Sequence, residues 1–198
     1  MAEIKSALEL ALEKTEGVKS DKEGVKRKGL NEKGKKMASQ FLNDHKDGKK
    51  LKKALGTVPK EDKKEVLKGV YQVLKANLTL PREDDFSEDL EVLKTGFTVI
   101  TDNGNQLNVL FEQLEQFFTQ FTQSKEQLYE GLKGQLTPLA QQKSQQISQQ
   151  RGVQIDLHPE DLPEFGQALQ ENMAKLTDQF QQALNNVRAE LDSILIPA

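Results

Sequence analysis

FTVITDNGNQLNVLF, residues 97–111, decides the fold, because this stretch is compatible with two different structures. The β-branched run at its start, the Asn103-Gly104 dipeptide and the alternating apolar residues after it are typical of a β-hairpin with a two-residue turn. The stretch also carries a helical stripe, with steps of three and four residues between Phe97, Ile100, Gly104, Leu107 and Phe111. A hairpin would make the protein a mixed fold, whereas helices would make it a bundle.

The residues on both sides of this stretch continue the helical spacing. Alternating steps of four and three residues connect Phe86, Leu90, Leu93, Phe97, Ile100, Gly104, Leu107, Phe111, Leu114, Phe118, Phe121, Lys125, Leu128 and Leu132. Only Gly104 and Lys125 in this series are not apolar, so the pattern is a heptad seam. A hairpin turning at Asn103-Gly104 would mix polar residues into both faces, and an isolated two-stranded hairpin is marginal in water. The seam therefore favours helices.

The polar residues 102–105 are poor material for a helix interior and indicate a break in the seam. Asn103, with Gln106 three residues later, has the form of a capping box. We therefore expect one helix to end near Thr101 and the next to begin near Asn103–Asn105. An unbroken, kinked helix is one alternative. A hairpin is the other, because Val153, Ile155 and Leu157 alternate and could supply a third strand.

The C-terminal part of the chain predicts long helices over about 82–101, 105–150 and 163–195. Gly131, Gly134 and Pro138 are expected to loosen or kink the second of these helices. The connector VQIDLHPEDLP, about a dozen residues between the last two helices, predicts an antiparallel hairpin. The expected fold class is all-α, with short N-terminal helices and a long, coiled-coil-like antiparallel helical hairpin.

The N-terminal part of the chain is rich in lysine and glycine, and we expect it to form short helices. The first, over residues 3–15, is expected to stop at Gly17, and a loose helix should follow near 30–45. Residues 1–80 hold 20 Lys/Arg and 12 Asp/Glu, and residues 81–198 hold 8 and 19, for net charges of +8 and -11. We therefore expect a basic N-terminal helical region, 1–80, and an acidic, Gln-rich hairpin region, 81–198.

Composition narrows the location and the chemistry. The N-terminus MAEIKSALELALEK lacks a basic leader and a continuous apolar segment, no stretch reaches the length of a membrane span, and cysteine is absent. These features predict a cytoplasmic protein without membrane contact and exclude disulfides and Cys-ligated metals.

No motif in the sequence predicts an enzyme, a metal site, a cofactor or a small-molecule substrate. His45 and His158 lie beside acidic residues in predicted loops, where a solvated turn is the expected structure. Five acidic residues within 83–89 fall where a helix should begin and complement its dipole. No glycine-rich phosphate loop and no nucleophile–histidine–acid set can be identified.

Two sets of residues are candidate binding sites. The first set belongs to the predicted hairpin and comprises Phe117, Phe121 and Lys125. Phe117 lies outside the seam, so it either packs on the N-terminal helices or contacts a partner. Lys125 occupies a seam position, where it either fixes register or oligomeric state or extends its amine to solvent.

The second set is the Lys-rich segment 19–64, which could neutralise the phosphates of a nucleic acid or another polyanion. Its candidate residues are Lys26, Arg27, Lys28, Lys35, Lys36, Lys49, Lys50, Lys52 and Lys53. Interleaved acids, and Phe41 as the segment's only aromatic residue, weigh against this function. The preferred hypothesis is protein–protein interaction or self-assembly, with polyanion binding as the alternative.

Several stretches give the sequence a family resemblance: MAEIKSALELALEKTEGV, FEQLEQFFTQFTQSKEQLYEGLK, and RG followed by DLPEFGQALQENMAKL. They resemble a family of uncharacterised bacterial helical proteins with no established function. The resemblance implies a bacterial, cytoplasmic helical protein and assigns no functional residues.

Overall fold

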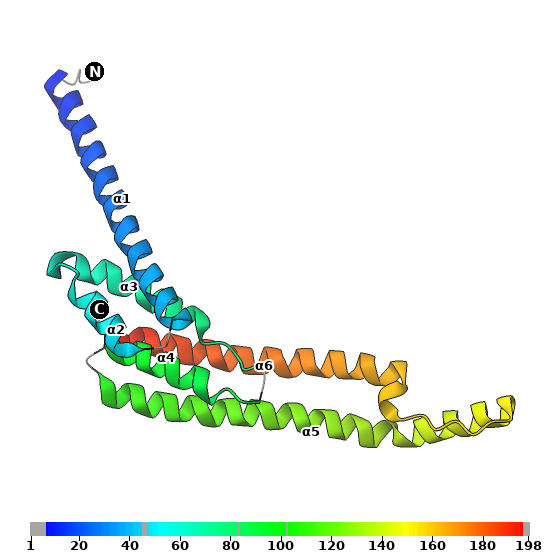
Figure 1. The fold of residues 1–198 in the computed structure, drawn as a ribbon. Helices are drawn as coiled ribbons and strands as arrows, with labels where there is room; N and C mark the ends of the chain where they lie inside the picture. Colours follow the sequence, from blue (N-terminus) through cyan, green and yellow to red (C-terminus); the bar gives the residue numbers. More distant parts are fainter. Residues whose placement is uncertain (1–6, 45–46, 83, 102, 196–198) are drawn as a thin grey trace. The chain divides into compact units, whose positions relative to one another are not determined.

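The computed structural model describes residues 7–44, 47–82, 84–101 and 103–195, and every regular element in these ranges is a helix (Figure 1). The elements are α1 (Ala7–Asn43), α2 (Gly48–Gly56), α3 (Lys60–Asn77), α4 (Ser87–Ile100), α5 (Gly104–Arg151), the 3₁₀ helix η1 (Pro159–Asp161) and α6 (Pro163–Leu195). The predicted all-α fold is confirmed.

The stretch 97–111 is a joint between two helices. α4 ends at Ile100 and α5 begins at Gly104. The Asn103 carbonyl accepts the first hydrogen bond of the new helix from the Leu107 amide, at 3.1 Å, and the Asn103 amide donates to the Thr101 hydroxyl, also at 3.1 Å. The predicted joint is therefore confirmed and the hairpin alternative is wrong.

The chain divides into two compact units. Unit 1 comprises Met1–Leu78 and Glu91–Leu107, and unit 2 comprises Thr79–Leu90 and Asn108–Ala198. Unit 1 holds 21 Lys/Arg and 14 Asp/Glu, a net charge of +7, and unit 2 holds 7 and 17, a net charge of -10. The charge asymmetry in the sequence therefore follows this structural division.

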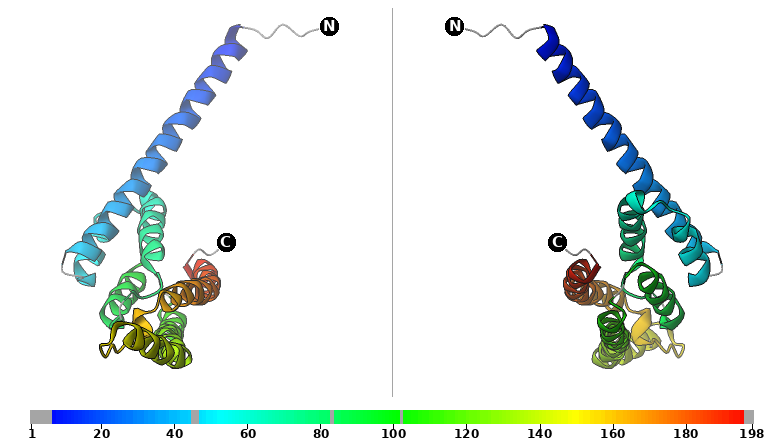
Figure 2. Two further views of the ribbon diagram at one scale, coloured as in Figure 1. Left: turned by 90° about the vertical axis from the view of Figure 1, so that its right-hand side faces the viewer. Right: turned by 90° about the vertical axis from the view of Figure 1, so that its left-hand side faces the viewer.

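α1 is a single helix of 37 residues, so the predicted short first helix, ending at Gly17, is wrong. A glycine inside a helix costs about 1 kcal/mol relative to alanine but still donates its backbone hydrogen bond, so it weakens a helix without ending it. The C-terminal part of α1 packs on α3, and its N-terminal part continues past α3 (Figures 1 and 2).

Where α1 and α3 cross in unit 1, the backbones of the two helices approach each other closely at two glycines. A Cβ atom at Gly34 would overlap the Val66 carbonyl oxygen, and one at Gly69 would overlap the Asn31 carbonyl oxygen. Around this crossing the buried core of unit 1 contains Ala38, Phe41, Leu51, Leu55, Val66, Val70, Tyr71, Leu74 and Phe97.

The sequence predicted that this helix begins near residue 82, but α4 begins at Ser87. Its hydrogen-bond ladder begins at the Phe86 carbonyl, which accepts from the Leu90 amide at 3.0 Å. The Phe86 ring packs edge-on against Phe118, with ring centroids 5.5 Å apart. This contact attaches Phe86, just before the helix, to α5. The partner residue is 32 positions away, so the residues around Ser87 do not predict the contact. Of the acidic residues in this region, Glu88 and Asp89 occupy the first turn of α4.

In unit 2, aromatic contacts join α5 to α6 and run in opposite order along the two helices. The Phe121 and Phe180 ring centroids lie 5.0 Å apart, and those of Tyr129 and Phe165 lie 5.3 Å apart. The predicted seam provides the buried side of α5 in this unit, at Phe111, Leu114, Phe118, Phe121 and Leu132.

Candidate functional site

The basic residues of α1 are partly neutralised by neighbouring acids. Lys26 forms an ion pair with Asp62 of α3 at 2.9 Å, and hydrogen bonding to that carboxylate raises the pKa of Lys26. Arg27 pairs with Glu23 at 3.5 Å, and Lys35 pairs with Glu32 at 2.8 Å, which lowers the pKa of Glu32. Three of the five predicted polyanion-binding cations on α1 are therefore already paired, whereas Lys28 and Lys36 are exposed.

The four lysines of α2 have a different environment. Lys49, Lys50, Lys52 and Lys53 are all exposed, and no ion pair joins any of them to another residue within the described part of the chain. Leu51 and Leu55, on the opposite side of this nine-residue helix, are buried. Burial of these two leucines therefore turns the lysines of α2 outward.

A pocket of about 550 Å³ in unit 1 brings lysines from two helices together. Lys49 and Lys52 line it from α2, and Lys94 lines it from α4. The remaining lining residues are Asp47, Gly48, Glu91, Thr95, Thr98 and Val99. Sequence reasoning identified Lys49 and Lys52 but missed Lys94, an isolated lysine in the acidic half of the sequence.

The first residue of α2, Gly48, lies close to Thr95 of α4. A Cβ atom there would lie 2.7 Å from Thr95 Cγ2, closer than carbon atoms ordinarily approach. Asp47 caps the same end of α2, since its Oδ1 accepts a hydrogen bond from the Lys49 amide at 2.8 Å. The first turn of α2 therefore lies beside Thr95, and Lys49 and Lys94 line the same pocket.

Two further features of unit 1 bear on anion binding. Lys60, Lys64 and Lys68 of α3 are exposed at intervals of four residues, which places them along one side of the helix. The aromatic residues of this unit, Phe41, Tyr71 and Phe97, are buried. The unit therefore presents exposed cations without an exposed ring on which a base could stack.

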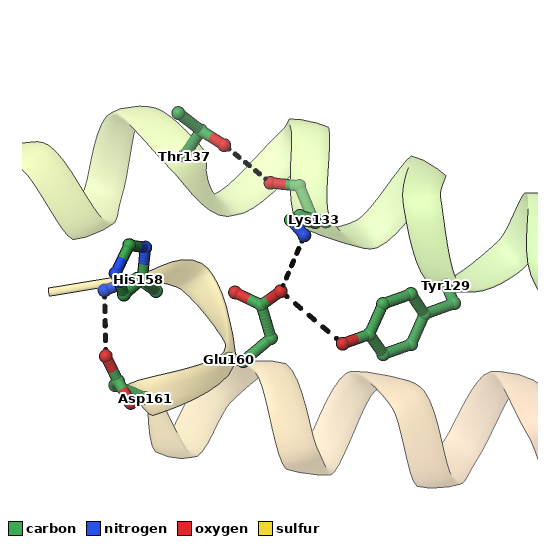
Figure 3. A network of polar contacts seen from close by, with 6 residues as sticks. All are labelled: Tyr129, Lys133, Thr137, His158, Glu160 and Asp161. Carbon is green, nitrogen blue, oxygen red and sulfur yellow. Dashed lines mark hydrogen bonds and ion pairs between the residues drawn. The ribbon is translucent and has the colours of Figure 1, made fainter.

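The connector between α5 and α6 contains His158, which lies beside acidic residues in the sequence. Its backbone amide donates to Asp161 Oδ2 at 2.8 Å (Figure 3). Glu160 instead pairs with Lys133 at 2.9 Å and accepts a hydrogen bond from the Tyr129 hydroxyl at 3.4 Å. Hydrogen bonding to Lys133 lowers the pKa of Glu160 and raises that of Lys133. These contacts hold η1 against α5.

No metal site is evident in the described ranges, which contain no group of three or more His, Asp or Glu residues placed to hold an ion. His45 lies outside the described residues.

Two serines of α5 hold the extended part of the connector, and the sequence analysis missed both. The Ser144 hydroxyl accepts from the Leu157 amide, and the Ser148 hydroxyl accepts from the Ile155 amide, each at 2.8 Å. Serines four residues apart on a helix lie one turn apart, about 6 Å, which is close to the rise of two residues in an extended chain. Hydroxyl groups therefore satisfy the backbone of the segment considered as a third strand.

The predicted partner-binding residues of α5 make contacts within unit 2. Phe117 packs against Phe180 of α6, with ring centroids 5.1 Å apart. Phe121 is buried and also contacts Phe180. Lys125 lies over the Phe121 ring and forms a 3.7 Å ion pair with Asp84. The three residues are therefore part of the packing of unit 2.

A family model described as "Family of unknown function (DUF6657)" matches residues 52–193, most of the chain. The chain belongs to this family. The expected resemblance to an uncharacterised family is confirmed. The matched span contains Lys52 and Lys94 of the pocket, whereas Gly48 and Lys49 precede it. No curated protein and no solved structure matches the chain.

In the part of the chain that the structure describes, no helix combines the length and the apolar character needed to cross a lipid bilayer.

Proposed function

We propose that this DUF6657 protein is a non-enzymatic, cytoplasmic nucleic-acid-binding protein whose unit 1 contacts the phosphate backbone of a duplex. The observation that carries the proposal is the set of exposed lysines on α2, which have no ion-pair partner among the described residues. Three of the acids interleaved in this region, Glu23, Glu32 and Asp62, pair with cations of α1 rather than with those lysines.

The charge distribution supports binding through unit 1. Its net charge is +7, whereas unit 2 carries -10 and would repel a polyanion. Neutralisation of phosphates by lysines releases counterions, so the affinity should fall steeply with salt.

The buried aromatic residues favour a duplex over a single strand. Proteins that bind single strands without sequence preference stack bases on exposed aromatic rings. In the described part of unit 1, Phe41, Tyr71 and Phe97 are all buried, so contacts to the backbone provide the binding energy. Such contacts position a protein on nucleic acid but do not read its sequence.

Fluorescence anisotropy with a labelled DNA duplex and the matching single strand tests the proposal. We expect duplex binding at about 50 mM salt that weakens markedly by about 200 mM, with weaker single-strand binding and little dependence on base sequence. The double variant Lys50→Gln/Lys53→Gln should bind less tightly. The double variant Arg151→Gln/Lys175→Gln, which removes the same charge from unit 2, should bind nearly as well as the wild type. Absence of duplex binding at the lower salt concentration would refute the proposal.

Protein–protein interaction is a second candidate, and one observation favours it. Residues 22–29 of α1 are all exposed, and Val25 retains 67% of its accessible surface. In the sequence, residues 7–16 hold three acids and one lysine, whereas residues 19–28 hold five cations and two acids. Antiparallel pairing of two α1 helices would place these oppositely charged segments together, which favours self-association.

Sedimentation equilibrium tests this second candidate. We expect a dimer that Val25→Lys weakens and that Val153→Lys, a change at an exposed valine of unit 2, leaves intact. A monomer at every accessible protein concentration would rule out self-association.

A further inference from the structure

We infer that the pocket between α2 and α4 is a phosphate site, in which Lys49, Lys52 and Lys94 hold one phosphate group of the nucleic-acid backbone. This inference rests on the proposed function and makes it specific, because it adds a residue from α4 to a set of cations that the sequence located within residues 19–64.

The lining of the pocket carries the inference. Three lysines from two helices line one hollow, and no ion pair engages any of the three among the described residues. The volume of about 550 Å³ lies within the range of about 300–1,000 Å³ typical of small-ligand sites. The pocket can therefore admit a phosphate together with part of its sugar. Charge-assisted hydrogen bonds from ammonium groups to phosphate are among the stronger polar contacts in proteins.

Acidic residues at the pocket limit how much negative charge it accepts. Asp47 and Glu91 also line it, so the formal charge of the lining is only +1. The Asp47 carboxylate is engaged as the cap of α2 through the Lys49 amide, whereas Glu91 is an exposed residue of α4. This balance suits one phosphate group rather than several. It also makes Glu91 an unfavourable neighbour of the ligand, and its neutral variant should bind more tightly.

Gly48 provides a test that leaves the charge unchanged. Because a Cβ atom at this position would press on Thr95, Gly48→Ala should move the first turn of α2 away from α4. We expect weaker binding from the separation of Lys49 and Lys94, although every cation is still present.

The decisive experiment compares duplex binding by four single variants of the full chain. Lys94→Gln should weaken binding several-fold. It should also make the negative slope of log affinity against log salt shallower by about 1, because one phosphate contact is lost. Glu91→Gln should tighten binding, and by more than Glu61→Gln, a matched charge change on α3. Lys175→Gln, in unit 2, should leave the salt slope unchanged. Circular dichroism spectra that match the wild type would show that each variant is folded.

The outcomes separate this inference from the proposed function. If the wild type binds the duplex, Lys50→Gln/Lys53→Gln weakens it and Lys94→Gln has no effect, then the phosphate site is wrong and the proposed function stands. If the wild type does not bind the duplex, the proposed function fails.

Titration of the isotopically labelled wild type with inorganic phosphate gives an independent result for the pocket. Amide shifts at Thr95 and Thr98 would support the site even if duplex binding fails, and shifts confined to other residues would overturn it.

Discussion

A Cβ atom on Gly34 would overlap the Val66 carbonyl oxygen, so no side chain fits between α1 and α3 at this point. Gly34→Ala should therefore destabilise the protein by at least about 2 kcal/mol, since backbone cannot move aside as a flexible side chain can. Gly24→Ala, in the same helix but with nothing within 4 Å of the added carbon, should stabilise the protein by up to about 1 kcal/mol. Urea unfolding of the two variants measures the difference. Similar effects would contradict the close crossing.

Ser144→Ala should destabilise unit 2 by about 1–3 kcal/mol, because it leaves the partly buried Leu157 amide without its acceptor. Ser193→Ala is a suitable control, since Ser193 is exposed and donates to the Glu190 carbonyl within its own helix. Its effect should stay within about 0.5 kcal/mol. Hydrogen exchange provides a second measurement. The Leu157 amide should exchange faster in Ser144→Ala, and unchanged exchange would show that the hydroxyl does not protect it.

The contact between Glu160 and Lys133 should stabilise the protein in a pH-dependent way. The folded chain lowers the pKa of Glu160 below its ordinary value of 4.5, so the contact contributes fully at pH values above 4.5. The contribution is lost as the pH falls through the lower, folded pKa. Glu160→Gln should therefore lower the thermal unfolding temperature at neutral pH, and this difference from the wild type should shrink in acid. Glu171→Gln, at an exposed position of α6, is the control. A difference that persists at low pH would show that the charge is not responsible.

Lys125→Met should change the free energy of unfolding by less than about 1 kcal/mol. The substitution keeps the apolar stem over Phe121 and removes a 3.7 Å ion pair whose partner, Asp84, has a side chain that is 87% exposed. Urea unfolding measures this change. A loss above about 2 kcal/mol would show that the charge at this seam position has a larger role than its exposed partner suggests.

Much of the helical structure could be predicted because helix formation depends on neighbouring residues. The predicted helices 105–150 and 163–195 correspond closely to α5 (Gly104–Arg151) and α6 (Pro163–Leu195). Capping residues, glycines and prolines mark these ends in the local sequence. Two predicted helix ends were wrong: the start of α4, where a distant contact decides the structure, and the end of the first helix, where the helix continues through a glycine. Phe118 anchors the residues before α4, and α1 continues through a glycine expected to stop it.

The candidate site was predictable only in part. The lysines of α2 stand out in the sequence because four of them occur in nine residues. Lys94 has no such signal, since it is 42 residues beyond Lys52 and flanked by apolar and neutral residues. Ser144 and Ser148 are equally inconspicuous within a Gln-rich segment, and their partners belong to the following connector.

The sequence by itself determined that the protein is all-α, that a joint interrupts the seam near Gly104, and that positive charge is concentrated toward the N-terminus. Heptad spacing, turn residues and composition express these properties locally. Only the tertiary structure decided which lysines share a pocket and which are paired with acids. Lys49, Lys52 and Lys94 share a pocket because α2 and α4 line it together. Lys26 pairs with Asp62 because α1 packs on α3. The shared pocket and the ion pair each join helices that are distant in the sequence, and the periodicity of the sequence does not predict which distant helices pack together.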